Sequence, residues 1–170
     1  MIKLLGCLMI VGASVFIALN YIGNLRIRVL GIRSMIELLS YIKIKISYEL
    51  LPLPILIQEF REKNGYPISD FLDECNAHLY NGRSLKDAWL LAVNSYSSQM
   101  CFTREDTSIL KEFATELGDS DLNGQITNIQ LYTEMLENSL IESEHILKEK
   151  RKVTLSCSLF GSLIVLVLLI

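Results

Sequence analysis

The residue types that most often carry catalysis are few and scattered in this 170-residue sequence. His78 and His145 are the only histidines, and they fall in separate predicted helices, with no serine or cysteine placed to act as a paired nucleophile. Adjacent acidic residues such as Glu105 and Asp106 point in different directions from a helix surface, so solvation or helix capping explains them more simply than acid–base chemistry. We therefore predict that the protein is not an enzyme.

The sequence also lacks the motifs of a nucleotide or metal site. No glycine-rich loop ends in Gly-Lys-Ser or Gly-Lys-Thr, the pattern whose backbone amides cradle phosphate. The segment Asp119-Ser120-Asp121 lacks the other ligands and the terminal glutamate of a calcium-binding loop, which leaves helix capping as its simpler role. We expect no cofactor, no metal ion and no small-molecule substrate.

The four cysteines form no Cys-x-x-Cys pair, whereas zinc sites need closely spaced ligands. Cys7 and Cys157 fall in strongly apolar segments near the two ends of the chain. Cys75 is predicted to be a small core residue, and the sequence assigns no role to Cys101.

Charge is the remaining chemistry. Between Glu59 and Glu144 there are 16 acidic and 6 basic residues. This excess argues against nucleic-acid binding, which needs clustered lysine and arginine. An acidic face can be simply solvated, or it can dock a partner of opposite charge. For docking we select the segment far in sequence from both apolar ends, with the candidate residues Glu105, Glu112, Glu116, Asp119 and Asp121.

Helical periodicity predicts the elements that would position these residues. From residue 25 to residue 50, apolar side chains recur every three or four positions and form one helical stripe. A second long helix is predicted after Gly124, with a seam that packs antiparallel against the first. The stripe comprises Val29, Ile32, Ile36, Leu39, Ile42 and Ile46, and the seam comprises Ile126, Ile129, Thr133, Leu136, Leu140, Ser143 and Leu147.

Shorter helices are predicted between these two, the first at about 53–63 after Pro52. Hydroxyl and carboxylate side chains cap helix starts, and glycines in the left-handed conformation end helices. The predicted starts are Ser69, Ser84 and a Thr103/Asp106 capping box, and the predicted ends are Gly82 and Gly118. Trp89 is predicted to anchor the core.

Two segments, Leu4 to Leu25 and Val153 to Ile170, carry no charged side chain. A helix of about 20 apolar residues crosses a membrane. A cleaved signal peptide is the alternative for the first segment, but its apolar stretch exceeds the usual core of about 7–15 residues and its cleavage geometry near Ala18 is poor. We predict membrane helices at residues 2–25 and 153–170, with one domain at residues 26–152.

The basic residues beside both segments lie on the side of the central domain. Arg26, Arg28 and Arg33 follow the first segment, and a lysine-rich run at 148–152 precedes the second. Such residues stay in the cytoplasm and suit an anionic membrane surface. We predict a cytoplasmic central domain, with both termini on the other side of the cell membrane. The predicted fold class is all-α, with two transmembrane helices bracketing an antiparallel cytoplasmic helical bundle.

Several short motifs resemble the stage III sporulation protein AB family in their order and spacing, over nearly the whole chain. They are Met-Ile-Lys-Leu-Leu-Gly at the start, Ile46-Ser-Tyr48 followed by Pro52-Leu53, Leu79-Tyr-Asn-Gly82-Arg-Ser84 leading into Ala88-Trp89, Glu116-Leu117-Gly118 with Asp121 and Gln125, and the final apolar helix. Lys45 departs from the pattern, because the resemblance implies a glutamate there.

The resemblance implies a membrane component of the sporulation channel complex between mother cell and forespore, with its domain on the mother-cell side. It also implies a likeness to the F-type platform proteins of type II secretion and type IV pilus systems, which bind a cytoplasmic ATPase. Expected partners are a companion ATPase, stage III sporulation protein AA, other stage III sporulation membrane proteins, and membrane lipids. Two alternatives from other classes are a small membrane transporter subunit and a stand-alone membrane scaffold.

Overall fold

The computed structural model describes the backbone of residues 2–49, 51–63, 68–117 and 121–169, and these residues form six helices and no strand. The side chains of 2–8, 10, 11, 14, 63 and 154–169 lie outside the description. The helices are α1 (Ile2–Glu49), α2 (Leu53–Lys63), α3 (Ser69–Tyr80), α4 (Leu85–Gln99), α5 (Arg104–Glu116) and α6 (Leu122–Leu169). The all-α prediction is confirmed.

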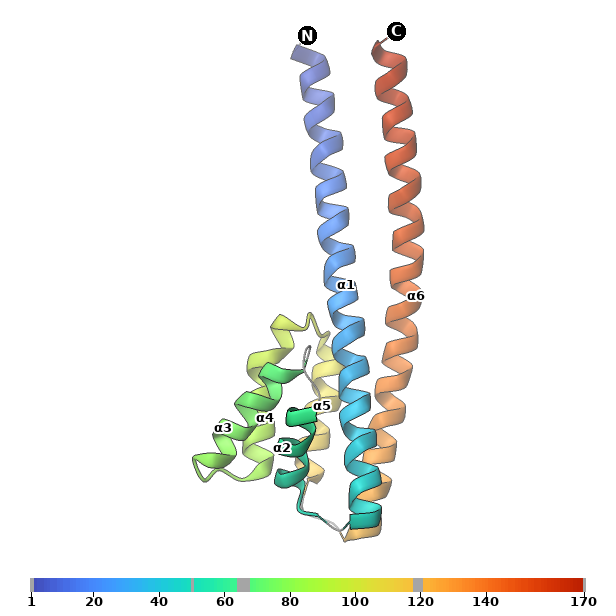
Figure 1. Ribbon diagram of the computed structural model, residues 1–170. Helices are drawn as coiled ribbons and strands as arrows, with labels where there is room; N and C mark the ends of the chain where they lie inside the picture. Colours follow the sequence, from blue (N-terminus) through green and yellow to red (C-terminus); the bar gives the residue numbers. More distant parts are fainter. Residues whose placement is uncertain (1, 50, 64–67, 118–120, 170) are drawn as a thin grey trace.

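The two long helices lie side by side with the chain ends together, and the four short helices pack against one end of the pair (Figure 1). Each helix contacts the next along the chain, and α6 closes the ring by its extensive contact with α1. Both long helices have 48 residues, so each is about 72 Å long at 1.5 Å per residue. The short helices cover less than half of that length, and the rest of the α1–α6 pair projects beyond them (Figure 1).

Local capping chemistry explains the end of α3 and the starts of α4 and α5. Ser84 accepts a hydrogen bond from the Asp87 amide at 3.1 Å and starts α4, as predicted. Thr103 and Asp106 form the predicted capping box of α5. Gly82 has φ +77° and ends α3, where the Arg83 amide donates to the His78 carbonyl at 3.2 Å, as in a Schellman motif.

One predicted cap is wrong. Ser69 is the first residue inside α3, and the capping position belongs to Ile68, which makes no side-chain cap. The Ser69 hydroxyl instead lies 3.4 Å from an Asp70 carboxylate oxygen. Ile68 is buried in the core, so apolar packing rather than a polar cap fixes this helix start. The predicted end at Gly118 lies outside the described residues.

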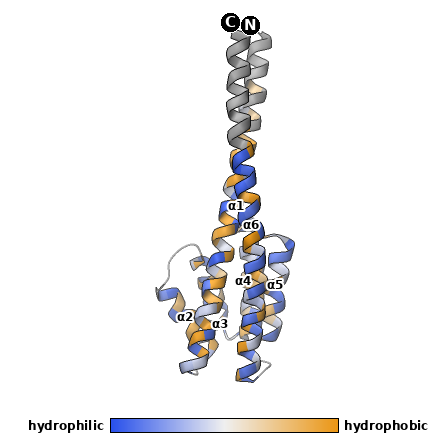
Figure 2. Cartoon of the chain, turned by 90° about the vertical axis from the view of Figure 1, so that its right-hand side faces the viewer, coloured by the Kyte–Doolittle hydropathy of each residue, from blue (hydrophilic) through white to orange (hydrophobic). Residues whose placement is uncertain are grey.

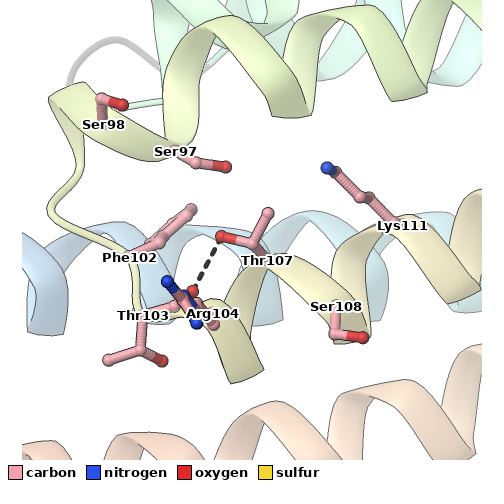
Figure 3. Close-up of a pocket in the computed structure, with 8 residues that line it drawn as sticks. All are labelled: Ser97, Ser98, Phe102, Thr103, Arg104, Thr107, Ser108 and Lys111. Carbon is pink, nitrogen blue, oxygen red and sulfur yellow. Dashed lines mark hydrogen bonds between the residues drawn. The ribbon is translucent and has the colours of Figure 1, made fainter.

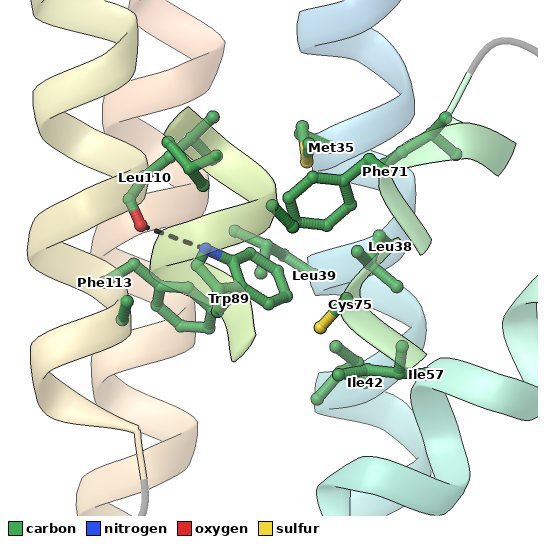
Figure 4. Close-up of a cluster of buried hydrophobic side chains, with 14 of the residues drawn as sticks. Met35, Leu38, Leu39, Ile42, Ile57, Phe71, Cys75, Trp89, Leu110 and Phe113 are labelled. Atoms are coloured by element: carbon green, nitrogen blue, oxygen red, sulfur yellow. Dashed lines mark hydrogen bonds between the residues drawn. The ribbon is translucent and has the colours of Figure 1, made fainter. Parts of the chain in front are cut away.

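The core lies between the lower part of α1 and the four short helices, and Trp89 is at its centre (Figure 4). The Trp89 ring packs edge-on against Phe71 and Phe113, with centroid distances of 5.0 and 5.2 Å. Its indole N–H donates to the Leu110 carbonyl at 3.0 Å, so the one polar atom of this ring is satisfied. Cys75 is fully buried beside the core of α1, and burial raises the pKa of its thiol to about 12.

The seam on α6 faces α1 as predicted, although the buried positions differ in part. Ile129, Leu136 and Ser143 are buried, and Tyr132 and Ser139 join them. On α1 the buried surface is wider than a single stripe because the helix contacts α6 on one side and the short helices on the other. Ile36, a predicted member of the stripe, is only half-buried.

One described segment, Val15–Glu49, is long and apolar enough to cross a membrane by length and composition. The side chains of the second predicted span, from residue 154 onward, lie outside the description, although the helical backbone of α6 continues to Leu169. Just beyond the bundle, hydrophilic and hydrophobic turns alternate along the two long helices (Figure 2).

Candidate partner-docking surface around helix α5

Helix α5 carries most of the predicted docking residues, and a buried ion pair fixes its position. The Arg28 side chain of α1 reaches Asp106 in the first turn of α5, with N–O distances of 2.7 and 3.1 Å. Arg28 is 6% exposed and Asp106 is fully buried. Ser139 of α6 donates to the Asp106 carboxylate and accepts from Arg28 at 3.1 Å. Three helices therefore meet at one charged group.

The surroundings of Asp106 favour its ionised form. Burial alone raises the pKa of this carboxyl, but hydrogen bonds from Arg28, Ser139 and the Thr103 backbone outweigh burial and lower the pKa below its usual value. The same contact with Asp106 raises the pKa of Arg28, and the nearby carboxylates of Glu142 and Glu105 add to that effect.

This pair is not predictable from the sequence, which suggests a cation beside the membrane for Arg28 and a capping role for Asp106. The capping role of Asp106 is confirmed. The expectation for Arg28 needs correction, because its charge is compensated inside the protein and is not free at a membrane surface. The two residues are 78 positions apart, and no local pattern links them.

The acidic residues of α5 share one edge of the helix. Glu105, Glu112 and Glu116 are spaced by seven and four residues and are all exposed. Burial raises the pKa of Tyr132 on α6, and the carboxylates of Glu116 and Glu112 raise it further. Glu112 also accepts a hydrogen bond from Ser108 at 2.8 Å.

The predicted docking residues do not form one continuous site. Glu112, Glu116 and Asp121 lie toward the end of the bundle farthest from the chain ends, whereas Glu105 lies at the opposite end of α5 (Figure 1). Asp121 accepts a hydrogen bond from the Gly124 amide at 2.9 Å and thereby starts α6, which agrees with the predicted capping role. Asp119 lies outside the described residues.

A second edge of α5 is basic and faces α4, and Arg104 at its start also lines a cavity with Glu105. Arg104, Thr107 and Lys111 line a cavity of about 400 Å³ together with Ser97 of α4. Figure 3 shows the Ser97 hydroxyl and the Lys111 amino group directed into the space between the two helices. The exposed surface of α5 is therefore divided into an acidic edge and a basic edge.

A second cavity, the junction cavity, lies where the bundle meets the projecting part of α1 and α6. Its volume is about 570 Å³, and its walls come from α1, the α4–α5 turn, the start of α5, and α6. The residues that line it include Tyr21, Asn24, Leu25, Arg104, Glu105, Glu142 and Ile146. Leu25 and Ile146 both line this cavity, and the hydrogen bonds from Arg28 to Ser139 and from Arg33 to Glu144 join the same stretches of α1 and α6. These two positions therefore lie at similar levels along the helix pair.

Cys101 also lines the junction cavity, and its backbone explains its position in the chain. It has φ +55°, the left-handed conformation that a helix end usually gives to glycine. The Phe102 amide donates to the Ser97 carbonyl at 2.9 Å and completes a Schellman motif at the end of α4. Met100 and Phe102, on either side of Cys101, then pack onto Gly31 of α1.

The remaining candidate residues for chemistry are dispersed on the surface. His78 and His145 each lie 3.8 Å from a glutamate one turn away on the same helix, Glu74 and Glu149 respectively. Among the side chains that the structure describes, no group of three histidine, cysteine or acidic residues could hold a metal ion.

Comparisons with known proteins agree with one another. The family model described as stage III sporulation protein AB matches residues 3–170. Stage III sporulation protein AB of Bacillus subtilis (strain 168) is 25% identical in an alignment of 170 positions that covers 99% of each chain. A solved structure of Stage III sporulation protein AB (SpoIIIAB) is similar with a TM-score of 0.62 and 25% identity, over 68% of this chain and 91% of that one. The predicted resemblance is confirmed, and the chain belongs to the stage III sporulation protein AB family.

Proposed function

We infer that this protein is a non-enzymatic membrane component of a secretion-like sporulation complex between mother cell and forespore. The projecting ends of α1 and α6 would cross the membrane, and the bundle would dock a cytoplasmic ATPase and other membrane subunits. One observation carries the proposal. The two long helices bring both chain ends together at one pole, and the folded bundle lies at the other (Figure 1). Membership of a sporulation family supports the biological setting.

The level of the membrane follows from the register of the two helices. Leu25 and Ile146 line the same cavity, and Val153 is seven residues, or about 10 Å, beyond Ile146. Counting back seven residues from Leu25 along α1 reaches Ala18. We therefore place the edge of the hydrocarbon at Ala18 and Val153, in place of the predicted edge at residue 25. Residues 2–18 and 153–169 then form two spans of equal length, about 26 Å each.

This placement suits the charges on both helices. The basic run at residues 148–152 would lie immediately outside the hydrocarbon, at the level of residues 19–23 of α1. With the edge at residue 25, the register would place the same basic run inside the membrane next to α1, at a cost of several kcal/mol per charge. The register thus favours a cytoplasmic bundle and termini on the other side.

The acidic edge of α5 is the proposed docking surface for the ATPase. Glu112 and Glu116 lie at the pole far from the membrane, where a soluble partner has free access. Both side chains are exposed, and opposite charge on the partner would give specificity and fast association. By analogy with F-type platform proteins, the partner would be stage III sporulation protein AA.

Charge reversal tests this surface. We expect the variant Glu112→Lys/Glu116→Lys to recover at least about tenfold less ATPase in a pull-down with detergent-solubilised protein. The matched control is Glu134→Lys/Glu137→Lys, which makes the same change of charge at two exposed positions on α6. These two residues line a different cavity, together with Lys43 of α1. Equal recovery by the wild type and both variants at several salt concentrations would remove the acidic edge from the proposal.

A further inference from the structure

The junction cavity lies at the level of the lipid head groups if the membrane begins at Ala18 and Val153, so this inference rests on the proposed function. Head groups occupy about 5–7 Å on each side of the hydrocarbon. Tyr21 lies three residues from Ala18, or about 4–5 Å, and Leu25 lies about 10 Å away. The part of the cavity beside Tyr21 therefore lies at the level of the head-group layer, and the rest lies nearer the bundle.

The charges around the cavity select among head groups. Arg28 is already paired with Asp106, so their charges cancel. In the described part of the chain, Arg104 makes no ion pair, and neither do the exposed carboxylates of Glu105 and Glu142. Among the described side chains that line the cavity, there are thus one cation outside an ion pair, Arg104, and two carboxylates near it. Inside the cavity, an anionic head group would add a further negative charge to this excess, and the basic run at residues 148–152, which is not part of the lining, would attract it instead. A zwitterionic head group places a cation beside the carboxylates.

We propose that the junction cavity binds the head group of a phosphoethanolamine lipid. The phosphate pairs with the Arg104 guanidinium, which offers several N–H donors in one plane. The primary ammonium donates hydrogen bonds to Glu105 and Glu142, which a quaternary choline group cannot do. Leu25 and Ile146 supply apolar surface beside the glycerol and the first methylene groups, in the direction of the spans.

Competition among lipids tests the proposal. The full chain is incorporated into nanodiscs with equal amounts of phosphatidylcholine, phosphatidylethanolamine and phosphatidylglycerol, and the lipids retained after release are counted by native mass spectrometry. We expect selective retention of phosphatidylethanolamine by the wild type. Retention should fall about tenfold in Glu105→Gln/Glu142→Gln and in Arg104→Gln, because each variant removes charged hydrogen bonds. The control Glu134→Gln/Glu137→Gln should retain lipid like the wild type.

A second measurement covers the case in which a variant folds poorly. Soluble dihexanoyl phosphatidylethanolamine, dihexanoyl phosphatidylcholine and inorganic phosphate are titrated separately against the detergent-solubilised wild type by isothermal titration calorimetry. Binding of the phosphatidylethanolamine alone supports the site. Equal binding of phosphate, equal binding of the choline lipid, or equal retention of all three lipids in the nanodiscs overturns it.

The two proposals fail in different ways. A chain that does not enter the nanodiscs contradicts the membrane-spanning part of the proposed function and, with it, the lipid site. A chain that enters them and retains no lipid selectively contradicts the lipid site alone, and the ATPase pull-down is unaffected.

Discussion

At the scale of single residues, the buried ion pair of Arg28 and Asp106 is the main electrostatic contribution to the fold. Their ion pair is the only one in the described part of the chain in which both side chains are buried. Removing one partner leaves the other charge buried without compensation, which costs far more than the pair contributes as a unit. The pair also joins α5 to both long helices, so its loss would loosen the attachment of α5, which carries the proposed docking surface.

We expect Asp106→Asn to lower the free energy of unfolding by about 3–5 kcal/mol, because Arg28 then keeps its charge without a carboxylate. Chemical denaturation of the detergent-solubilised chain, followed by circular dichroism, measures this loss. The double variant Arg28→Met/Asp106→Leu should recover most of the stability, since apolar residues of similar size replace both charges. As a control, Arg61→Gln breaks the exposed pair with Asp73 and should have a much smaller effect. A double variant as unstable as Asp106→Asn would contradict this account.

The same carboxyl predicts a pH dependence. The pKa of Asp106 is lower in the folded chain than in the unfolded chain, where it is about 3.9. Its stabilising contribution is therefore fully present above about pH 4 and is lost as the pH falls through the lower folded value. Urea denaturation of the wild type and Asp106→Asn across this range should show the two stabilities converging toward acid pH. A constant difference down to the lowest pH would show that Asp106 does not carry the effect.

At the scale of elements, Gly31 sets how closely the α4–α5 turn approaches α1. A Cβ atom at this position would lie 2.8 Å from a ring carbon of Phe102 and 2.9 Å from the Met100 sulfur, closer than such atoms pack. The glycine weakens helix propensity in α1, and the close contact compensates for that weakness. Gly31 is therefore a packing residue of the junction and not a break in the helix.

Gly31→Ala should destabilise the chain by about 1–3 kcal/mol, because Met100 and Phe102 must move, with part of the loss offset by better helix propensity. The matched control is Gly23→Ala on the same helix, where no atom lies within 4 Å of the added carbon. That control should be neutral or slightly stabilising. Thermal unfolding of both variants in one detergent makes the comparison, and equal shifts would exclude close packing as the reason for glycine.

Helix identity and most helix ends could be predicted from sequence, because capping and periodicity are local. The segment predicted at about 53–63 is α2, and Ser84 and the Thr103 box start their helices as expected. The predicted cap at Ser69 is wrong because the core packing of its neighbour Ile68 determines where α3 begins. The ion pair of Arg28 with Asp106 could not be predicted, because the two residues are 78 positions apart and each has an ordinary local role in the sequence. For the same reason, the sequence could not separate Glu105 from Glu112 in space.

At the scale of the whole molecule, the register of α1 against α6 decides where a membrane can lie. The side-chain pattern of one helix alone allows an edge anywhere from residue 18 to residue 25. Only the register of the two helices, in which Leu25 and Ile146 line one cavity, relates that edge to the charged run before Val153. The orientation and the level of the bundle are thus linked and can be tested together.

Cysteine labelling tests the level. In a background without the native cysteines, Asn24→Cys should react with a membrane-impermeant maleimide added from the cytoplasmic side, and Phe16→Cys should not. Both native side chains are exposed on α1, so protein burial does not distinguish them. Protection of both would restore the edge at residue 25. Reporter fusions after Gly82 and at Ile170 should report opposite sides of the membrane, and a Gly82 fusion outside the cytoplasm would contradict the docking model.

The equal length of the two long helices has a mechanical consequence. Each is an unbroken hydrogen-bonded rod of 48 residues, and α6 contains neither glycine nor proline between Gly124 and Gly161. A pair of such rods, each about 72 Å long, would act as a lever that pivots at the bundle. A rotation of about 10° about that end displaces the opposite tips by about 12 Å, roughly the diameter of a helix. A small rotation of the bundle by a bound partner would thus become a larger displacement of the helix tips, which any neighbouring subunit would have to accommodate.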